Sequence, residues 1–117
     1  MNGSQATRIA FDQLKFTPRF AYGEQAGVVE VTGTGQGTKL GTGFARFTTA
    51  EIPWTVKYDE VILVIEGSLT VRGPDGDLVA GPLDCIWLPK DTALTYCAES
   101  ALVFYAIYPA DWLEVEE

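Results

Sequence analysis

Histidine is absent from this chain of 117 residues. Imidazole supplies the usual nitrogen ligand for first-row metals in proteins and the usual acid–base group near neutral pH. Its absence excludes histidine-ligated metal sites and histidine-dependent catalysis. We therefore expect no metal and no other cofactor, and any proton transfer must fall to carboxyl, phenol, thiol or amine groups.

Basic residues, cysteines and long apolar runs are also scarce. Asp and Glu number 16 against 8 Lys and Arg, a net charge of −8 that repels nucleic acids and anionic membranes, so we expect neither as a partner. No apolar run approaches the length of a membrane span, and the first ten residues lack the apolar core of a secretory signal. Cys85 and Cys97 are too few for a disulfide framework, so we expect both to be reduced and buried in a cytoplasmic protein.

Short β-rich segments separated by turn residues fill most of the chain. Hydrophobic residues make up 47 %, enough for one core, and no amphipathic helix of normal length is visible. About eight strands at roughly ten-residue spacing predict an all-β sandwich or barrel. The expected strands are Val28–Thr32, Leu40–Phe47, Val56–Ile65, Ser68–Arg72, Leu78–Ala80, Cys85–Leu88, Ala93–Tyr96 and Ala101–Tyr108.

Turn residues set the expected boundaries. Gly33–Gly37 predicts a mobile turn, Glu51–Pro53 a break, and Gly73–Gly76 the turn of a hairpin. Residues 1–27 show no clean period and form an N-terminal arm, with one short strand expected around Arg19–Tyr22. Residues 28–112 form the barrel, and residues 113–117 an acidic tail.

The segment Val61–Ile65 is apolar at every position. A strand with two apolar faces needs a barrel interior on one side and a second cover on the other. We therefore expect a homodimer.

Glu60 is the residue that most clearly invites chemistry. If the strand runs on without a bulge, alternation places Trp54, Tyr58 and Glu60 on one face together with Ile62 and Val64. A carboxylate among apolar neighbours is paired, protonated or functional. In the functional interpretation Glu60 is a general acid or base whose pKa is raised by an apolar interior.

Three aromatic residues complete this candidate site for a small-molecule ligand. Tyr58 would donate a hydrogen bond or act as partner acid, Trp54 would form a wall, and Tyr96 would line the same cavity because it shares parity with Leu94. In the structural alternative, Trp54 and Tyr96 only pack in the core. Glu60 is then tied to a buried partner, for which Tyr96, Tyr105 and Arg46 are the candidates.

A family resemblance rests on four segments, Ile52–Glu60, Glu66–Arg72, Trp87–Lys90 and Tyr108–Trp112. They resemble the cupin domain of the ethanolamine-utilisation family EutQ. The spacing Glu60-x6-Gly67 matches the end of the first cupin motif, and the turn Pro89-Lys90-Asp91 stands in the second. The positions where cupins carry metal-binding histidines fall on Trp54, Val56 and Leu94.

The resemblance implies a small single-domain cupin, a double-stranded β-helix or jelly-roll barrel. It also implies a role in ethanolamine catabolism, association with a bacterial microcompartment, and the acetate kinase activity attributed to EutQ. Our first hypothesis is a metal-independent enzyme that acts on a small polar metabolite in the barrel. The alternatives are a non-catalytic ligand-binding or assembly protein and an acetate kinase, although Gly33–Lys39 is no P-loop because Thr38 precedes the lysine.

Overall fold

Antiparallel strands make up nearly all of the protein's regular structure. The structure is a computed structural model and describes residues 5–19 and 22–113. In chain order the strands are β1 (Thr17–Pro18), β2 (Ala26–Thr32), β3 (Gly41–Thr55), β4 (Asp59–Gly67), β5 (Leu69–Gly73), β6 (Gly76–Ala80), β7 (Cys85–Leu88) and β8 (Ala93–Tyr108). Two short 3-10 helices, η1 (Phe11–Gln13) and η3 (Thr34–Gln36), lie before β1 and after β2.

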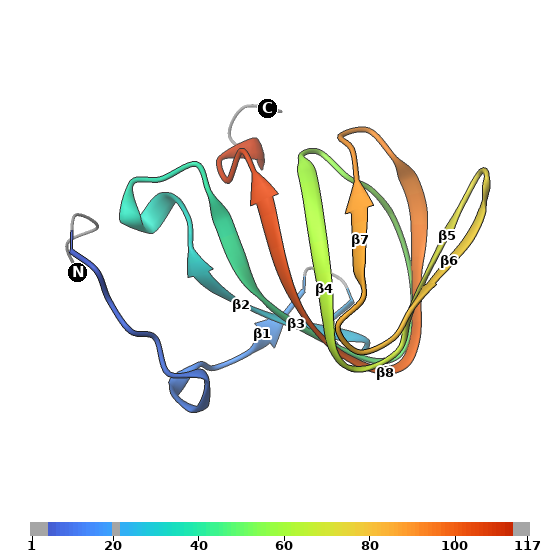
Figure 1. The fold of residues 1–117 in the computed structure, drawn as a ribbon, viewed down its shortest axis with the longest axis horizontal. Coiled ribbons are helices and arrows are strands. Elements are labelled where there is room, and N and C mark those ends of the chain that lie inside the picture. Colours follow the sequence, from blue (N-terminus) through green and yellow to red (C-terminus); the bar gives the residue numbers. More distant parts are fainter. Residues whose placement is uncertain (1–4, 20–21, 114–117) are drawn as a thin grey trace.

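The two long strands β3 and β8 pair with each other along their whole length and bend together from one layer into the other (Figure 1). In the first layer the order is β1-β2-β3-β8-β4-β7. In the second layer the first half of β8 pairs with β5, which pairs with β6. Two layers joined by shared, bent strands form a jelly-roll barrel, which confirms the predicted all-β fold.

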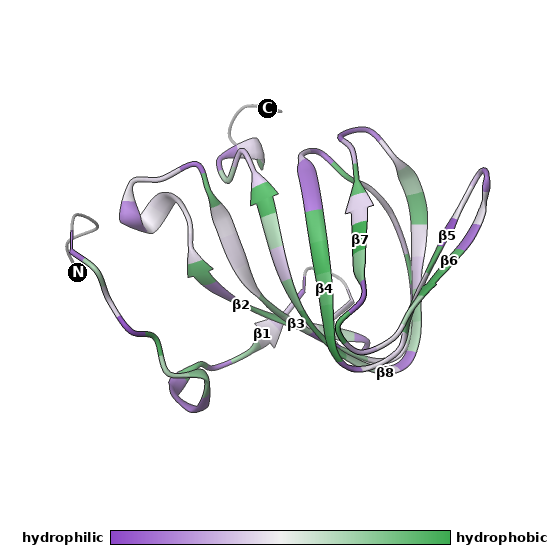
Figure 2. Ribbon diagram, viewed as in Figure 1, coloured by the Kyte–Doolittle hydropathy of each residue, from purple (hydrophilic) through white to green (hydrophobic). Residues whose placement is uncertain are grey.

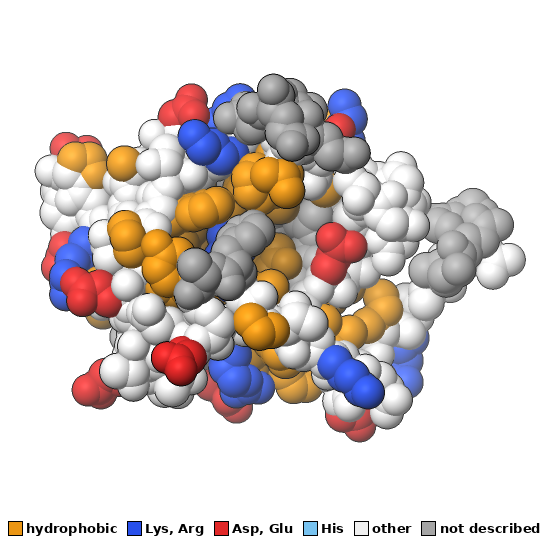
Figure 3. Space-filling model, turned by 180° about the vertical axis from the view of Figure 1, so that it is seen from behind, with side chains coloured by type: hydrophobic (Ala, Val, Ile, Leu, Met, Phe, Trp, Pro, Cys, Tyr) orange, Lys and Arg blue, Asp and Glu red, His pale blue; other side chains and the backbone are white. Residues whose placement is uncertain are grey.

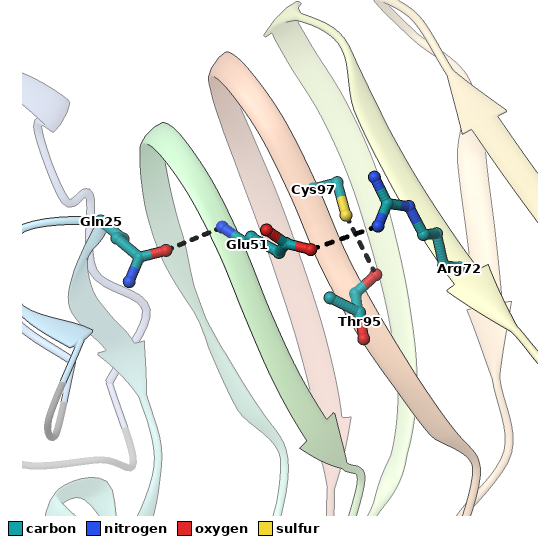
Figure 4. A network of polar contacts seen from close by, with 5 residues as sticks. All are labelled: Gln25, Glu51, Arg72, Thr95 and Cys97. Carbon is teal, nitrogen blue, oxygen red and sulfur yellow. Dashed lines mark hydrogen bonds and ion pairs between the residues drawn. The ribbon is translucent and has the colours of Figure 1, made fainter.

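The break predicted at Glu51–Pro53 is wrong, because β3 continues through it. The Thr48 N–H still donates to the Gln25 carbonyl oxygen, but beyond it β3 pairs, among the described residues, with β8 alone and leaves its other edge without a neighbouring strand. On that edge the side-chain oxygen Oε1 of Gln25 accepts the Glu51 backbone N–H at 2.7 Å (Figure 4). Pro53 lies two residues further along, so its missing N–H falls on the same free edge and costs no ladder hydrogen bond.

A second correction concerns the expected strand Val56–Ile65. β3 ends at Thr55, residues 56–58 form a connection, and β4 begins at Asp59. Val56 hydrogen-bonds through its backbone to the turn at residues 91–92 instead of to a neighbouring strand. Trp54 and Glu60 therefore lie on different strands, and strand alternation alone does not place them on one face.

The turn chemistry agrees better with the structure. The predicted hairpin turn joins β5 to β6, and Asp91, which stands where the second cupin motif has glycine, adopts a left-handed φ of 75°. The short strand expected at Arg19–Tyr22 is wrong for the described residues, since the arm pairs with β2 through Thr17–Pro18. Phe20 and Ala21 lie outside the described residues, as do residues 114–117 of the expected tail.

Both cysteines are free, but the expectation that both are buried is wrong. Cys85 is exposed and Cys97 is half-buried. They lie on outward-facing positions of β7 and β8. The sequence did not show which positions of these strands face outward and which face the core.

The core fills the space between the layers with the inward-facing residues of the bent strands. Hydropathy is highest along β4 and the lower part of β7 (Figure 2). On the side opposite to Figure 1, hydrophobic side chains also gather in the middle of the surface, with many charged groups around them (Figure 3). Among the described residues no helix is long and apolar enough to cross a membrane. The largest fully buried side chains are Ile52, Leu69, Val56, Val64, Val71 and Val103.

Candidate functional site

A cavity of about 150 Å³ lies inside the barrel, lined by β2, β3, β4, β8 and the arm. Its walls combine apolar side chains with polar ones. The polar groups are the carboxyl groups of Glu60 and Glu30, the phenol groups of Tyr58, Tyr96 and Tyr105, the hydroxyl groups of Thr32 and Thr42, and the guanidinium group of Arg19. Polar groups that converge on a cavity with apolar walls are typical of small-molecule sites.

Glu60 is the buried acid of this cavity. It lies on β4 between Leu88 of β7 and Ile107 of β8, and only 7 % of it is exposed. Burial raises the pKa of Glu60 from 4.5 to about 7, although the Tyr96 hydrogen bond and the Arg19 charge oppose the shift. A carboxyl group with this pKa can give or take a proton near neutral pH.

Tyr96 is the hydrogen-bond partner of Glu60. Its hydroxyl group donates to Oε1 of Glu60 at 3.0 Å from the neighbouring layer. Burial, followed by the nearby Glu60 carboxylate, raises the pKa of Tyr96 well above 10, so the phenol stays protonated and remains a donor. Of the three partners considered from the sequence, Tyr96 is the one that makes this bond. Arg46 lies elsewhere, over the ring of Phe16 at 5.3 Å.

Tyr58 lies in the connection between β3 and β4 and is 3 % exposed. Nε1 of Trp54 donates a hydrogen bond to the Tyr58 hydroxyl oxygen at 3.2 Å, and Trp112 packs edge-on against both rings. Burial and the Glu60 charge raise the pKa of Tyr58. Trp54 is not among the cavity-lining residues, so it lies behind Tyr58 and fixes its position.

Arg19 brings positive charge to the cavity, and sequence reasoning missed it. Its guanidinium carbon lies 4.9 Å from the centre of the Trp54 ring. Its charge lowers the pKa values of Tyr58 and Glu60 against the effect of burial. No periodicity in the arm singled out this arginine, because its position depends on how the arm folds back over the barrel.

Tyr105, on β8, is the third phenol of the cavity. Burial raises its pKa to about 12, so it too acts as a neutral hydrogen-bonding group. Glu30 lines the cavity as well, so the cavity combines two carboxyl groups, three protonated phenols and one guanidinium group.

The residues around Glu60 do not fit a metal ion of the kind that cupins bind. The positions that correspond to ligating histidines hold Trp54, Val56 and Leu94, none of which offers a donor atom suited to such an ion. In the described part of the chain, no three His, Cys, Asp or Glu side chains gather closely enough to hold one.

Comparisons with known proteins agree with this architecture. The family model for the ethanolamine utilisation protein EutQ matches residues 2–114. The acetate kinase EutQ of Escherichia coli K12 is 31 % identical over 87 residues, which are 74 % of this chain and 37 % of that protein. This chain therefore spans less than two-fifths of the length of that relative.

Solved structures give the same assignment. The ethanolamine utilisation protein Q of Salmonella typhimurium LT2 superposes with a TM-score of 0.82 at 27 % identity, covering 88 % of this chain and 85 % of that one. An RmlC-like cupin of Shewanella frigidimarina superposes with a TM-score of 0.73 at 14 % identity, covering 91 % and 93 %, a similarity that concerns the fold alone. The protein therefore has the cupin fold and belongs to the ethanolamine utilisation protein EutQ family.

Proposed function

We propose that this protein is a metal-independent enzyme that acts on a small polar metabolite of ethanolamine-related catabolism, with Glu60 as the general acid or base. The observation that carries the proposal is the carboxyl group of Glu60 at the wall of a cavity. This residue is only 7 % exposed, and burial raises its pKa to about 7. Groups whose pKa lies near the working pH are the most effective proton-transfer catalysts. Buried acids with raised pKa values cluster at functional sites.

Each neighbour has a role in this proposal. Tyr96 holds Oε1 of Glu60 and leaves the second carboxyl oxygen for the substrate. Tyr58, fixed by Trp54, donates a hydrogen bond or acts as partner acid, and Arg19 attracts a polar or anionic group of the substrate. In this proposal the protein acts in the cytoplasm. The resemblance to the EutQ family implies that it also associates with a bacterial microcompartment.

The size of the cavity limits the substrate. A cavity of about 150 Å³ holds a molecule the size of benzene, or about six non-hydrogen atoms. Ethanolamine and acetate are within this limit.

The experiment compares the wild type with Glu60→Gln after treatment with EDTA. Both proteins are incubated with ethanolamine, acetate, acetaldehyde or acetyl phosphate, and turnover is followed by NMR of the small molecule. We expect at least about a hundredfold loss of turnover in Glu60→Gln, because the amide cannot transfer the proton. Gln keeps an oxygen that accepts from Tyr96, so the fold should persist. Equal rates in the two proteins, or loss of wild-type activity with EDTA, would contradict the proposal.

A second candidate function is acetate kinase, favoured by the similarity to the acetate kinase EutQ of Escherichia coli and by the cationic Arg19 at the cavity. A nucleoside triphosphate is several times larger than the cavity, so it would have to bind outside the mouth. The test is acetyl phosphate formation from acetate and MgATP, with thermal stabilisation by MgATP as the binding readout. If millimolar MgATP gives no acetyl phosphate and no thermal stabilisation, this candidate is excluded.

A non-catalytic ligand-binding or assembly role is the remaining alternative, favoured by the absence of ligating residues at the three histidine positions. Calorimetry would then detect binding of one of the same small molecules, with the same affinity in Glu60→Gln and no turnover in either protein.

A further inference from the structure

The cavity carries a second carboxyl group, that of Glu30, at its β2 end. Glu30 lines the cavity from β2, opposite Gly43 of β3. Its carboxyl group lies over the backbone of Gly33, where a β-carbon would come within 2.6 Å of Oε1 of Glu30. Over the ranges 5–19 and 22–113, this carboxyl group accepts no hydrogen bond and joins no ion pair. Its oxygens can therefore accept hydrogen bonds from a ligand in the cavity.

Two threonine hydroxyl groups near Glu30 can only accept from a ligand. Thr32 follows Glu30 on β2 and pairs with Thr42 of β3, and both line the cavity. The Thr32 hydroxyl group donates its proton to the carbonyl oxygen of Leu40 at 2.8 Å. In the 2.7 Å contact between the two hydroxyl groups, Thr42 must then be the donor. Glu30 and the two threonines therefore offer a ligand hydrogen-bond acceptors and one negative charge.

Groups of the opposite kind line the cavity from the arm and from the connection between β3 and β4. The guanidinium group of Arg19 has five N–H donors, no acceptor and a permanent positive charge. The Tyr58 hydroxyl oxygen accepts from Nε1 of Trp54 at 3.2 Å, which leaves the hydroxyl proton for a partner in the cavity. Donors combined with a positive charge are the groups that recognise a carboxylate.

The two charged groups enter the cavity from separate points. The backbone N–H of Arg19 donates to the carbonyl oxygen of Ala26 at 3.1 Å, and Glu30 lies four residues further along the same strand. Four residues of a strand span about 13 Å. Both charges act on Tyr105, whose pKa is raised most by burial, lowered by Arg19 and raised by Glu30. The cavity therefore has a positive end and a negative end.

This arrangement distinguishes small ligands by their charge. A simple anion bound at Arg19 would be repelled by the Glu30 carboxylate, and a simple ammonium ion bound at Glu30 would be repelled by Arg19. Each of these ligands would satisfy one end of the cavity and not the other. A molecule that carries both charges meets both ends at once, so the cavity should select it over molecules that carry only one.

We infer that the cavity binds a small zwitterion of the amino-acid class, with the carboxylate at the Arg19 end and the ammonium group at the Glu30 end. The inference rests on the proposed function, because it assigns the ligand class of the same site. Glycine, alanine and β-alanine are within the limit of about six non-hydrogen atoms that the cavity sets. Glu30 is then a specificity-determining residue, since it selects the ammonium group.

The first test compares three ligands of nearly equal size by isothermal titration calorimetry of the wild type at about pH 6. Glycine carries both charges, glycolate has a hydroxyl group in place of the ammonium group, and glycinamide has an amide in place of the carboxylate. At this pH amino groups are protonated and Glu60 is mostly neutral. We expect glycine to bind at least about tenfold more tightly than either of the others. Glycine that binds no more tightly than both, or not at all at tens of millimolar, overturns the inference.

The second test removes the negative charge. Glu30→Gln keeps the length of the side chain and a carbonyl acceptor, so we expect its affinity for glycine to fall at least about tenfold and its affinity for glycolate to stay the same or rise. Glu24→Gln is the matched control, because Glu24 is exposed just before β2 and does not line the cavity. Equal affinities for glycine in the two variants would overturn the inference. Circular dichroism identifies any variant that fails to fold.

Failure of this inference and failure of the proposed function give different results. Selective binding of glycine that is lost in Glu30→Gln supports the inference even where no small molecule is turned over, a result that contradicts the proposed function. Turnover of ethanolamine or acetate that depends on Glu60, without selective binding of glycine, supports the proposed function and overturns the inference.

Discussion

The protonation state of Glu60 is coupled to the stability of the barrel. Its carboxyl group is buried at the wall of the cavity and accepts a hydrogen bond from Tyr96 on one oxygen. Burial favours its neutral form, so the folded protein holds this proton more tightly than the unfolded chain does. A buried carboxyl group lowers the stability of the fold when it ionises. Such a group is therefore expected where its proton takes part in function.

Glu60→Gln should therefore remove a pH dependence from folding. Below pH 4.5 the group is protonated in both states, and between 4.5 and about 7 only the unfolded chain loses the proton. Wild-type stability should fall over that range relative to Glu60→Gln by about 3 kcal/mol and then stay level. Urea unfolding at several pH values measures this. Glu66→Gln, at an exposed position of the same strand, is the control, and a pH-independent difference for Glu60→Gln would refute the account.

Tyr96→Phe isolates the hydrogen bond. Loss of the donor leaves a buried oxygen of Glu60 unpaired, which should destabilise the protein by about 1 to 3 kcal/mol, more at high pH than at low pH. The pKa of Glu60 should rise, because the Tyr96 hydrogen bond lowers it. Tyr108→Phe, on a tyrosine that is 57 % exposed, should cost less than about 0.5 kcal/mol. Equal costs in the two variants would mean that the bond contributes nothing specific.

The sequence predicted part of this site and missed part of it. Glu60 stood out because it is a carboxylate next to an unbroken apolar segment, and Tyr96 was one of the three candidate partners named for it. Arg19 was missed because its place depends on the path of the arm, for which the sequence offers no periodic signal. Trp54 was placed beside Glu60 on the condition that one strand ran unbroken from 54 to 64, and this condition fails because β3 ends at Thr55, although the indole of Trp54 still reaches Tyr58.

At the scale of elements, the long strands depend on features that a local pattern cannot contain. β3 passes through Pro53 because the free edge needs no donor there, and Gln25 from the segment just before β2 satisfies the Glu51 N–H on that edge. Glu51 also pairs with Arg72 of β5 at 3.3 Å, although both side chains are more than half exposed (Figure 4). Such a pair adds little stability, so the continuity of β3 rests on its pairing with β8.

The turn after β4 has the strictest requirement. Gly67 has φ of 78°, and a β-carbon there would overlap the carbonyl oxygen of Ser100. Gly67→Ala should destabilise the fold by at least about 2 kcal/mol, since it adds both strain and a clash with backbone. Gly35→Ala, which meets nothing within 4 Å, is the matched control and should change stability by less than about 1 kcal/mol. Urea unfolding of both variants decides, and similar costs would contradict this explanation.

Hairpin chemistry and the spacing Glu60-x6-Gly67 were therefore readable in the sequence, because each depends on neighbours close along the chain. The expected strands Ala93–Tyr96 and Ala101–Tyr108 are a single strand, β8, and β1 at Thr17–Pro18 was not expected. The breaks were not readable in the sequence either. At residues 56–58 a strongly β-forming segment leaves the ladder because its backbone bonds to the turn at residues 91–92, a contact between segments far apart in the chain.

At the scale of the whole molecule, the homodimer that the outward apolar face of Val61–Ile65 predicts should make the barrel more stable at higher protein concentration. If two copies share that face, dissociation accompanies unfolding and mass action enters the melting temperature. We expect the Tm of the wild type to rise by a few degrees for each tenfold increase in concentration, and that of Val61→Lys to stay constant. A wild-type Tm that does not change with concentration would speak against a dimer that persists up to unfolding.

The protonation of Glu60 is the claim on which the proposed function depends most. An NMR titration of the side-chain carboxyl carbons in protein labelled with ¹³C-glutamate, with the Glu60 signal assigned through its loss in Glu60→Gln, measures it in the intact fold. We predict a midpoint near 7 for this signal. A midpoint at the ordinary value of 4.5 would contradict the account, because Glu60 would then be an ionised structural carboxylate with no proton to transfer near neutral pH.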